Sequence, residues 1–325
     1  MQTLPRSLKI GVLRGGPSPE YDVSLQTGAN VLRQLSETHN PIDIFISKDG
    51  KWHIQGIERS PERILKNVDV IFNAMHGEYG EDGQVQAVLD LYAVPYTGSG
   101  RYESAIAMNK WLTKEKLKSA GIKTPVSYLV RQTDSISAKA KEIFSSLPHP
   151  LIVKPACGGP SVGLQKVDSY SEFLSALESV LSEHGSAIVE EYIVGREVTC
   201  GVVDGLRGQE TYSLPVVEIV PPKGKLFDYE SKYNGKSKEI CPGNFSQAEK
   251  KEIERMSALV HKNLGLLHYS RSDFIVSPRR GIYFLEVNTL PGLTKESLLP
   301  KSLEAIGVSV KDFLHHVIGL ALERK

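Results

Sequence analysis

Short apolar runs of strand length recur through the first part of the chain. The clearest are residues 8–13, Ile42–Ile46 and residues 68–73, and each is followed by a polar turn that contains glycine. A segment of helical length follows the first run. Strands that alternate with helices favour an α/β class with a parallel sheet, in which the loops after the strands gather at one edge. We therefore expect these loops to carry the functional site.

The first of these loops, Arg14-Gly15-Gly16, leads into a predicted helix. Ser18 is placed as its N-cap and Pro19 as its first residue, and the helix should continue to about residue 35. Glycines before a helix N-terminus favour an anion there, but Glu20 in the first turn is itself an anion. Two interpretations stay open: Glu20 compensates the helix dipole, or it holds the ammonium group of a ligand.

The loop after the third run, residues 76–83, combines three glycines with three acidic residues. His76 taken alone is well explained as a capping or core histidine. The density of glycine and acid around it favours a functional loop over an idle connection. Residues 96–100, Tyr-Thr-Gly-Ser-Gly, indicate a hinge or a domain boundary.

A helix is predicted after this hinge, over residues 104–120. It carries four lysines, at positions 110, 114, 116 and 118. Lysines at this density are most simply interpreted as the solvated face of a helix.

A strand over residues 148–155 ends near Lys154, and small residues dominate the loop that follows, residues 156–163. Small residues let backbone N–H groups approach a phosphate, and the Lys154 ammonium supplies a point charge. The loop lacks the Gly-Lys-Ser/Thr ending of a Walker A motif. Phosphate binding and an ordinary hairpin turn both stay open here.

Two later helices open with a predicted capping box, formed by Ser169 with Glu172 and by Ser246 with Glu249. Between them lies a long polar stretch with several aromatic residues, from about residue 221 to 242. Its length and polarity are typical of a lid rather than of a connection within a core.

Near the C-terminal end, residues 274–276 and 282–287 are apolar runs separated by Pro-Arg-Arg-Gly, which predicts a hairpin. We centre its turn between the two arginines. The two strands then pair Asp273 with Glu286 and Arg271 with Asn288. Residues two apart on a strand share a face, so these four polar groups should project from one side of the sheet. The other side should hold the apolar side chains of the hairpin, Phe274, Leu285 and Val287.

This polar face has the composition of a metal site. Two carboxylates and a carboxamide are hard ligands, suited to a magnesium ion that also holds nucleotide phosphates. Carboxylates that face each other across strands are destabilising unless a cation separates them. The alternative is a solvated sheet face with scattered charges, and one β-bulge would change the predicted register.

Composition limits the class of protein. The chain has 325 residues, 40% of them hydrophobic and 24% charged, which is ordinary for a soluble globular protein of two or three domains. The formal net charge of +1 favours neither a nucleic-acid nor a membrane partner. Three cysteines without a CxxC motif argue against a disulfide scaffold and indicate a reducing compartment, the cytoplasm. We also find no secretory segment, and no run approaches the ~20 apolar residues of a membrane span.

Taken together, the motifs identify a family. The chain resembles D-alanyl-D-alanine ligases of the ATP-grasp superfamily from its first strand to its last helix. The ordered set of matching blocks is specific, although no single block is: Gly15-Gly16 with Glu20 to Leu25; His76-Gly77, Gly80 to Gly83 and Gln86; Tyr96 to Gly100; Met108 to Lys110; Lys154-Pro155; Ser161 to Gly163; Glu190-Glu191; Asp228 to Tyr233; Arg271 to Phe274; Glu286 to Gly292; and Ser297-Leu298.

The resemblance implies an ATP-grasp fold of class α/β with α+β elements, in three domains. The N-terminal parallel-sheet (pre-ATP-grasp) domain would span residues 1–97. The central domain with the phosphate loop would span residues 98–186, and the C-terminal domain with the metal site and the lid residues 187–325. ATP would lie between the central and C-terminal domains.

The resemblance also implies a reaction. Two D-alanines would be ligated through a D-alanyl phosphate for peptidoglycan synthesis, with ATP and two Mg²⁺ ions, or Mn²⁺ in their place. The partners would be D-alanine, ATP and a second copy of the chain in a homodimer.

Site residues carry over position by position. Catalytic roles would fall on Glu20, Tyr233, Arg271, Gly292 and Ser161. The nucleotide would contact Lys110, Lys154, Glu190, Glu191, Ile193, Glu197 and Lys232. D-alanine would contact Glu20, His76, Arg271, Gly292, Ser297 and Leu298, and the metal ligands would be Asp273, Glu286 and Asn288.

One position departs from the family pattern. The family has a serine where this chain has Pro160, and that serine links the N-terminal glutamate to the lid tyrosine. Proline has neither a side-chain donor nor an N–H group, so the link between Glu20 and Tyr233 has to use Ser161, a water or another contact. Two alternatives to the D-alanine ligase therefore stay open: another ATP-dependent carboxylate–amine ligase, one that makes D-alanyl-D-lactate included, or a nucleotide-binding homologue impaired by Pro160.

Overall fold

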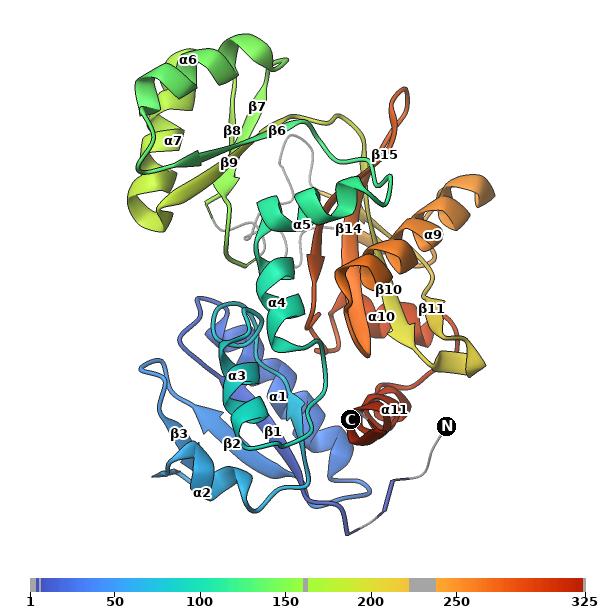
Figure 1. Cartoon of the computed structure of the whole chain (residues 1–325). Coiled ribbons are helices and arrows are strands. Elements are labelled where there is room, and N and C mark those ends of the chain that lie inside the picture. The colour runs from blue at the N-terminus through green and yellow to red at the C-terminus, as the bar shows by residue number, and fades with distance from the viewer. Residues whose placement is uncertain (1–3, 6, 160–162, 222–237, 324–325) are drawn as a thin grey trace.

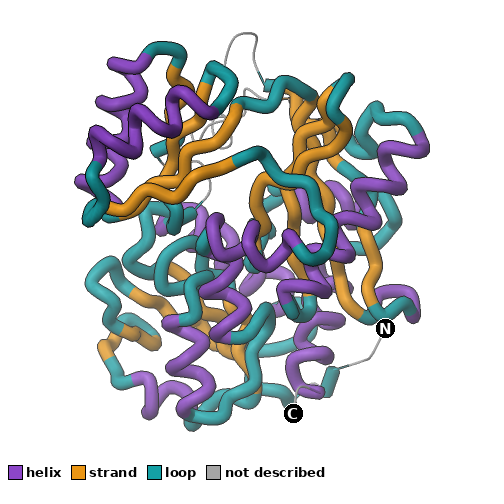
Figure 2. Tube along the Cα trace, turned by 45° about the horizontal axis from the view of Figure 1, so that its top comes forward, coloured by secondary structure: helices purple, strands orange, loops and turns teal. Residues whose placement is uncertain are grey.

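The structure is a computed structural model that describes residues 4–5, 7–159, 163–221 and 238–323. Its described strands form three sheets, which Figure 2 shows as separate groups of strands. In Figure 1 the first sheet lies at the bottom, the middle sheet at the upper left and the last sheet at the right. The predicted α/β class is confirmed.

The first sheet has the order β4-β3-β2-β1-β5, and β1 pairs in parallel with both β2 and β5. The predicted parallel sheet is therefore confirmed at its centre, while β3 and β4 extend it in antiparallel fashion. Its strands are β1 (Ile10–Gly15), β2 (Ile42–Ile46), β3 (Trp52–Ile54), β4 (Ile57–Glu58) and β5 (Val70–Asn73). Its helices are α1 (Tyr21–Leu35), α2 (Pro61–Leu65) and α3 (Gln84–Leu91).

Helix α1 begins two residues later than predicted. The residue before the helix is Glu20, and the Ser18 hydroxyl accepts a hydrogen bond from the Glu20 N–H at 3.0 Å. Ser18 therefore closes the turn that leads into the helix instead of capping the helix itself. This turn holds the Glu20 side chain in a buried position.

The middle sheet has the order β6-β9-β7-β8 with every pair antiparallel. It consists of β6 (Ser127–Arg131), β7 (Leu151–Pro155), β8 (Gln165–Val167) and β9 (Ser186–Glu191), covered by α6 (Ile136–Ser146) and α7 (Tyr170–His184). The capping box that opens α7 is confirmed. The predicted domain boundary at residue 187 cuts through β9, because β9 hydrogen-bonds on both sides to strands of the middle sheet.

The last sheet has the order β13-β12-β10-β14-β15, with β11 paired to β10. Its strands are β10 (Arg196–Asp204), β11 (Thr211–Ser213), β12 (Val217–Val220), β13 (Lys238–Ile240), β14 (Tyr269–Ser277) and β15 (Gly281–Asn288). A 3₁₀ turn, Leu206–Gly208, follows β10. The helices of this part are α9 (Gln247–Leu264), opened by the predicted capping box, α10 (Leu298–Glu304) and α11 (Val310–Glu323).

Two helices connect the three parts. The predicted helix over residues 104–120 is interrupted at Asn109, so that α4 (Arg101–Met108) and α5 (Lys110–Lys118) are separate. The Asn109 backbone is extended, and its side chain accepts from the Leu112 N–H as the N-cap of α5. Both helices pack into the core of the last sheet, through residues such as Ala107 and Leu117.

The C-terminal helix returns to the beginning of the chain. Phe313 and Val317 of α11 share a core with Ile10 and Val31 of the first sheet and α1, and Figure 1 shows α11 close to this part of the molecule. This packing places the ends of β14 and β15 next to the loops of the first sheet. The predicted functional loops are thereby brought to one region.

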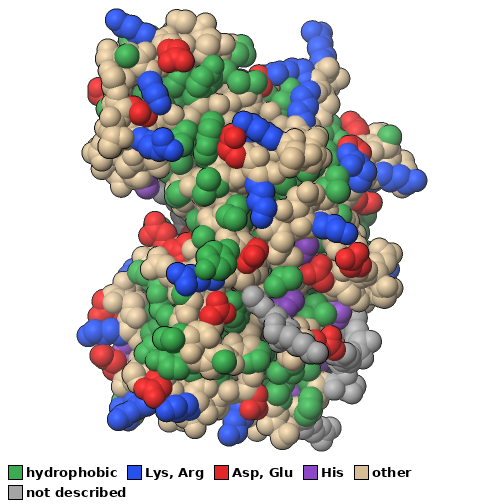
Figure 3. All heavy atoms as spheres, in the orientation of Figure 1, with side chains coloured by type: hydrophobic (Ala, Val, Ile, Leu, Met, Phe, Trp, Pro, Cys, Tyr) green, Lys and Arg blue, Asp and Glu red, His purple; other side chains and the backbone are tan. Residues whose placement is uncertain are grey.

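Over the described part of the chain, no helix combines the length and the apolar composition that crossing a membrane requires. On the face shown in Figure 3, basic and acidic side chains are interspersed without a continuous patch of either sign.

Candidate functional site

The polar face of the β14–β15 hairpin forms as predicted. Arg271 pairs with Asn288 and Asp273 pairs with Glu286. The path to this register differs from the prediction, however. The strand pair nearest the turn is Ser277 with Gly281, and the register shifts between residues 273 and 274.

This shift is a β-bulge at Leu285. Phe274 pairs with Phe284 and Asp273 with Glu286, which leaves Leu285 as the extra residue. Leu285 therefore lines the pocket beside Glu286, and its predicted place on the apolar face is wrong. The turn is centred on Arg279, whereas we predicted a centre between Arg279 and Arg280. The extra residue in β15 compensates for this shift, so the predicted pairs Asp273–Glu286 and Arg271–Asn288 are correct.

Two positively charged side chains lie beside the carboxylates of this face. The Arg271 guanidinium donates to both oxygens of Asp273, at 3.1 and 3.2 Å. Lys110 Nζ lies 3.6 Å from Glu286 Oε2. The Thr199 hydroxyl of the neighbouring strand β10 also donates to Asp273 Oδ1 at 2.6 Å. These contacts hold the two carboxylates in fixed orientations.

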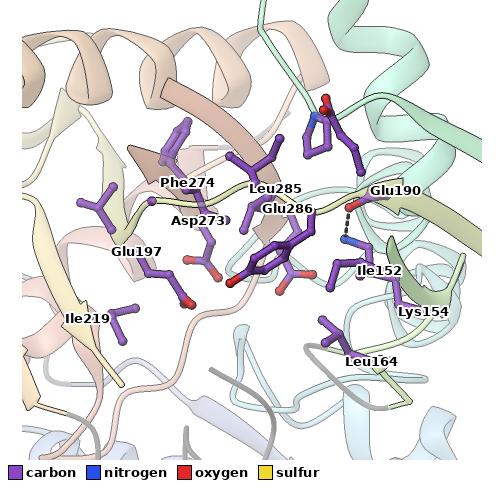
Figure 4. A pocket seen from close by; sticks show the side chains of 17 residues that line it. Ile152, Lys154, Leu164, Glu190, Glu197, Ile219, Asp273, Phe274, Leu285 and Glu286 are labelled. Atoms are coloured by element: carbon purple, nitrogen blue, oxygen red, sulfur yellow. Dashed lines mark ion pairs between the residues drawn. The ribbon is translucent and has the colours of Figure 1, made fainter. Parts of the chain in front are cut away.

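A pocket lies between the hairpin and the middle sheet. In Figure 4 the carboxylates of Glu197, Asp273 and Glu286 point into it from the last sheet, and Lys154 and Glu190 lie on the opposite side. The rest of the lining is largely apolar and includes Ile193 and Ile219. An apolar pocket with charged groups at one end suits a flat aromatic base joined to an anionic group.

Glu190 is buried between two lysines. Lys154 Nζ lies 2.9 Å from Glu190 Oε2, and Lys114 donates a short hydrogen bond to Glu190 Oε1. Burial opposes the ionisation of Glu190, but the two ammonium groups outweigh burial and hold the pKa of its carboxyl below its usual range. Burial also lowers the pKa of Lys114 to about 8, in spite of the Glu190 carboxylate.

The solvated lysine face predicted for this helix is only half right. Lys116 and Lys118 are exposed, whereas Lys110 and Lys114 are buried. The difference arises because the last sheet, the phosphate loop and Glu190 all pack against one side of α5.

The neighbouring Glu191 is buried as well but is held by different groups. Arg280 Nη1 of the hairpin turn lies 2.8 Å from Glu191 Oε2, and the Val126 N–H donates to Glu191 Oε1 at 3.1 Å. Glu191 thus ties the middle sheet to the hairpin at the rim of the pocket.

The loop after β7, which was predicted to bind phosphate, contacts the start of α5 through Cys157 and Gly158. Asn109 forms an isolated β-bridge with Cys157, and Lys110 Nζ donates to the Gly158 carbonyl at 3.0 Å. Lys110 therefore lies between this loop and Glu286, and Lys154 lies at the end of the strand before the loop. Of the two lysines that were predicted to bind phosphate, Lys154 lines the pocket, whereas Lys110 lies outside this lining, beside Glu286.

Glu20 reaches the same loop from the first sheet. A Cβ atom built on Gly159 would lie 2.3 Å from Glu20 Oε2, and one built on Gly77 would lie 2.9 Å from it. A carboxylate that only compensated the helix dipole would not need to lie against two other loops. The geometry therefore favours the ligand interpretation of Glu20 over the dipole interpretation.

Glu81 attaches the loop over residues 76–83 to the segment after β15, and His76 attaches this loop to α1. The His76 ring shares a hydrogen bond of 2.8 Å with the Thr27 hydroxyl, and burial lowers the pKa of its imidazole to about 4. Glu81 accepts from the N–H groups of Leu290 and Gly77, at 2.8 and 2.9 Å. Burial, together with the Glu20 carboxylate, raises the pKa of Glu81 to about 7.

Sequence reasoning assigned no role to Glu81 or Lys114. For Glu81 the signal was its place among the glycines of the loop over residues 76–83. For Lys114 it was the spacing of four residues from Lys110, which puts both lysines on one helix face.

The loop after β15 brings the remaining predicted residues together. The Ser297 hydroxyl accepts from the Thr294 N–H at 3.1 Å and lies 2.8 Å from the position of a Cβ atom on Gly292. Leu298 begins α10 and packs on Val217 and Ile219. Gly292, Ser297 and Leu298 therefore lie in one segment. The predicted residues Ser161, Lys232 and Tyr233 lie outside the described residues, as does Pro160.

The donor set of the hairpin fits a hard divalent cation. Asp273 and Glu286 face each other across the strands, and Asn288, two residues from Glu286 on β15, adds an amide oxygen. No three His, Cys, Asp or Glu side chains converge in the described ranges. The oxygens that this set offers are those that Mg²⁺ prefers.

Known proteins resemble the chain along nearly its whole length. The family described as "D-ala D-ala ligase C-terminus" matches residues 117–319, and "D-ala D-ala ligase N-terminus" matches residues 9–64 and 54–99. The D-alanine–D-alanine ligase of Christiangramia forsetii is 34% identical, over 98% of this chain and 99% of its own. That of Syntrophotalea carbinolica is 37% identical, over 98% and 97%.

Solved structures agree with this. The D-Ala:D-Ser ligase of Enterococcus faecalis superposes with a TM-score of 0.85 at 32% identity, covering 97% of this chain and 99% of its own. The D-alanine–D-alanine ligase of Coxiella burnetii superposes with a TM-score of 0.84 at 26% identity, covering 98% and 95%.

Proposed function

The chain belongs to the family of D-alanine–D-alanine ligases, and from this premise we propose how its residues carry the reaction. The protein is a ligase that joins two D-alanines in an ATP-dependent reaction for peptidoglycan synthesis. The observation that supports our assignment of roles most directly is the polar face of the β14–β15 hairpin, which lies opposite Lys154 and Glu190 across one pocket.

ATP occupies this pocket in our proposal. The base lies along residues 190–193, where Ile193 supplies apolar contact and Glu190 a hydrogen-bond acceptor, and Glu191 holds the strand beneath it. Glu197 binds the ribose. Lys110 and Lys154 bind the phosphates, and Lys232 of the lid joins them. Ammonium groups in a partly dry pocket offset the charge of the transferring phosphoryl group.

Asp273, Glu286 and Asn288 would hold two Mg²⁺ ions, or Mn²⁺ ions in their place. A bound divalent cation neutralises the phosphate oxygens and orients the terminal phosphoryl group. Arg271 and Lys110 lie beside these carboxylates, and a cation held there would offset the carboxylate charge in their place, so that both side chains could contact the substrate.

The first D-alanine binds with its ammonium group at Glu20, near His76. Its carboxylate attacks the terminal phosphorus of ATP, giving D-alanyl phosphate and ADP. A carboxylate is a poor electrophile, and phosphorylation turns one of its oxygens into part of a good leaving group. The neutral His76 and the nearby Glu81 shape this site by fixing the loops around Glu20.

The amine of the second D-alanine then attacks the acyl carbon. Arg271 and the Gly292 N–H stabilise the oxyanion of the tetrahedral intermediate, and Ser297 and Leu298 contact the second D-alanine. Loss of phosphate from this intermediate gives the dipeptide. The predicted lid over residues 221–242 ends too late, because Lys238–Ile240 form β13 and pair with β12. In our proposal the segment before β13 excludes water, and Tyr233 and Ser161 take part in its closure.

The second substrate is the least constrained part of this proposal. One of the similar structures is a D-Ala:D-Ser ligase, so D-serine is the first competitor to compare with D-alanine, and D-lactate is the second. Tyr233 favours D-alanine over D-lactate, because relatives that use D-lactate replace this tyrosine. We further propose that the protein works in the cytoplasm as a homodimer.

The test is phosphate release from ATP and magnesium, with and without D-alanine, and with the product identified by mass. D-alanine-dependent release with D-alanyl-D-alanine as the product supports the proposal. More product from D-serine or D-lactate than from D-alanine would change the acceptor. ATP binding without D-alanine-dependent release would support an impaired homologue instead. In that case Pro160→Ser should restore turnover if the missing hydroxyl is the cause.

A further inference from the structure

The inward face of α5 is unusual because two lysines occupy it. The buried residues of this helix are Lys110, Thr113, Lys114 and Leu117, which is the spacing of a core-facing stripe. A lysine is almost never fully buried unless it is paired. Lys110 faces the phosphate loop and Glu286, whereas Lys114 has no role in the function proposed above.

Lys114 lies next to the proposed nucleotide pocket, on the far side of Glu190. It does not line the pocket, but the Glu190 carboxylate that it contacts does. The side chains of Lys114 and Glu190 are only 2% and 3% exposed. One oxygen of Glu190 accepts from Lys114 and the other lies 2.9 Å from Lys154. Glu190 is therefore shared between a lysine behind the pocket and a lysine within it.

The net charge of Glu190 and its two lysines determines how strongly this part of the pocket attracts an anionic nucleotide. The cluster contains one carboxylate and two ammonium groups, so it carries a surplus positive charge when all three are ionised. Without Lys114, Glu190 would be balanced by Lys154 alone and the surplus would vanish. Because the groups are buried, water would screen this change only weakly.

The contact also joins two parts of the molecule. Lys114 belongs to α5, whose Leu117 packs in the core of the last sheet, and Glu190 belongs to β9 in the middle sheet. The ion pair therefore connects a helix that packs on the last sheet with a strand of the middle sheet. It fixes the Glu190 side chain relative to the hairpin that carries Asp273 and Glu286.

We propose that Lys114 is a positioning residue for nucleotide binding: it orients Glu190 and balances its charge, so that the charge of Lys154, which contacts the other Glu190 oxygen, is not cancelled and can attract the phosphates. This inference rests on the proposed binding of ATP in the same pocket. It differs from that proposal because Lys114 itself does not touch the nucleotide.

The test compares Lys114→Met, which keeps the apolar stem without the charge, with Lys114→Arg, which keeps the charge. Lys118→Met is the matched control, since Lys118 is exposed on the same helix and its contacts, with Glu115 and the Trp111 ring, lie at the surface. ATP affinity is measured by calorimetry without D-alanine, so that the result does not depend on turnover. Michaelis constants for ATP and D-alanine and a thermal melt follow for each variant.

We expect Lys114→Met to weaken ATP binding on the order of tenfold, the size of effect found for residues that orient metal ligands. Lys114→Arg should recover most of this loss, and the Michaelis constant for D-alanine should change little. A folded Lys114→Met protein with wild-type ATP affinity overturns the inference, as does a variant that loses stability while its folded fraction binds ATP normally. If wild type binds ATP but ligates no D-alanine, the proposed function fails and the Lys114 comparison still stands.

A second measurement covers the case in which Lys114→Met does not fold. The groups that face Lys114 are Glu190, Lys154 and Glu191. ATP affinity of the wild type should fall above pH 8 as Lys114 loses its proton, and Lys114→Arg should keep its affinity through the same range. Identical pH dependence in the two proteins overturns the inference.

Discussion

Glu81→Gln should change how the stability of this protein depends on pH. Glu81 is buried and lies near the Glu20 carboxylate, and these two causes raise the pKa of Glu81 to about 7 from an ordinary 4.5. Glutamine has nearly the same shape but does not titrate. One of its two polar atoms can still accept from Leu290 or Gly77, as a protonated Glu81 does.

The direction follows from proton binding. Between pH 4.5 and 7 the unfolded carboxyl is ionised while the folded one keeps its proton, so the free energy of unfolding of the wild type falls as pH rises through this window and levels off above it. One pKa unit corresponds to ~1.4 kcal/mol, which gives about 3 kcal/mol across the window. Glu81→Gln lacks this contribution and should gain about that much stability relative to wild type between pH 4.5 and 8.

Urea unfolding of both proteins at several pH values between 4.5 and 8 measures this difference. Glu78→Gln is the control, because Glu78 is exposed in the same loop. Stability curves for wild type and Glu81→Gln that stay parallel across the window would refute the reasoning. A relative gain for Glu78→Gln of the same size would assign the effect to general charge rather than to the buried site.

Three further predictions concern the reaction. Arg271→Met should lower kcat/KM for D-alanine-dependent phosphate release on the order of 100-fold, the scale of a lost oxyanion donor. A variant that retains half of the activity would contradict the role assigned to Arg271. Gly292→Ala places a Cβ atom 2.8 Å from Ser297 Oγ, and the resulting shift should reduce turnover by about 10- to 100-fold with an unchanged thermal melt. Removing divalent cations with a chelator should stop phosphate release, and Asp273→Asn should raise the magnesium concentration for half-maximal rate by roughly tenfold or more. An unchanged magnesium requirement would exclude Asp273 as a ligand.

Local patterns in the sequence were enough for the elements and for much of the site. The strands of the first sheet, both capping boxes and the pairing of Asp273 with Glu286 follow from periodicity and turn chemistry. The hairpin shows the limit of this reasoning. Its polar pairs are correct only because a bulge at Leu285 offsets a misplaced turn, and the bulge cannot be read from alternation alone.

Tertiary packing decided which charged groups are buried. By sequence, Lys110, Lys114, Lys116 and Lys118 form one series, and Glu190 is one of two adjacent acids. The fold places α5 against the last sheet and β9, so that two of these lysines leave water and Lys114 meets Glu190. Burial depends on what lies opposite a side chain, and the group opposite Lys114 comes from a strand more than seventy residues away. The sequence by itself determined which charged residues stand in the strands and loops of the predicted site, whereas only the packing of the three sheets decided which of them are buried and how their charges are shared.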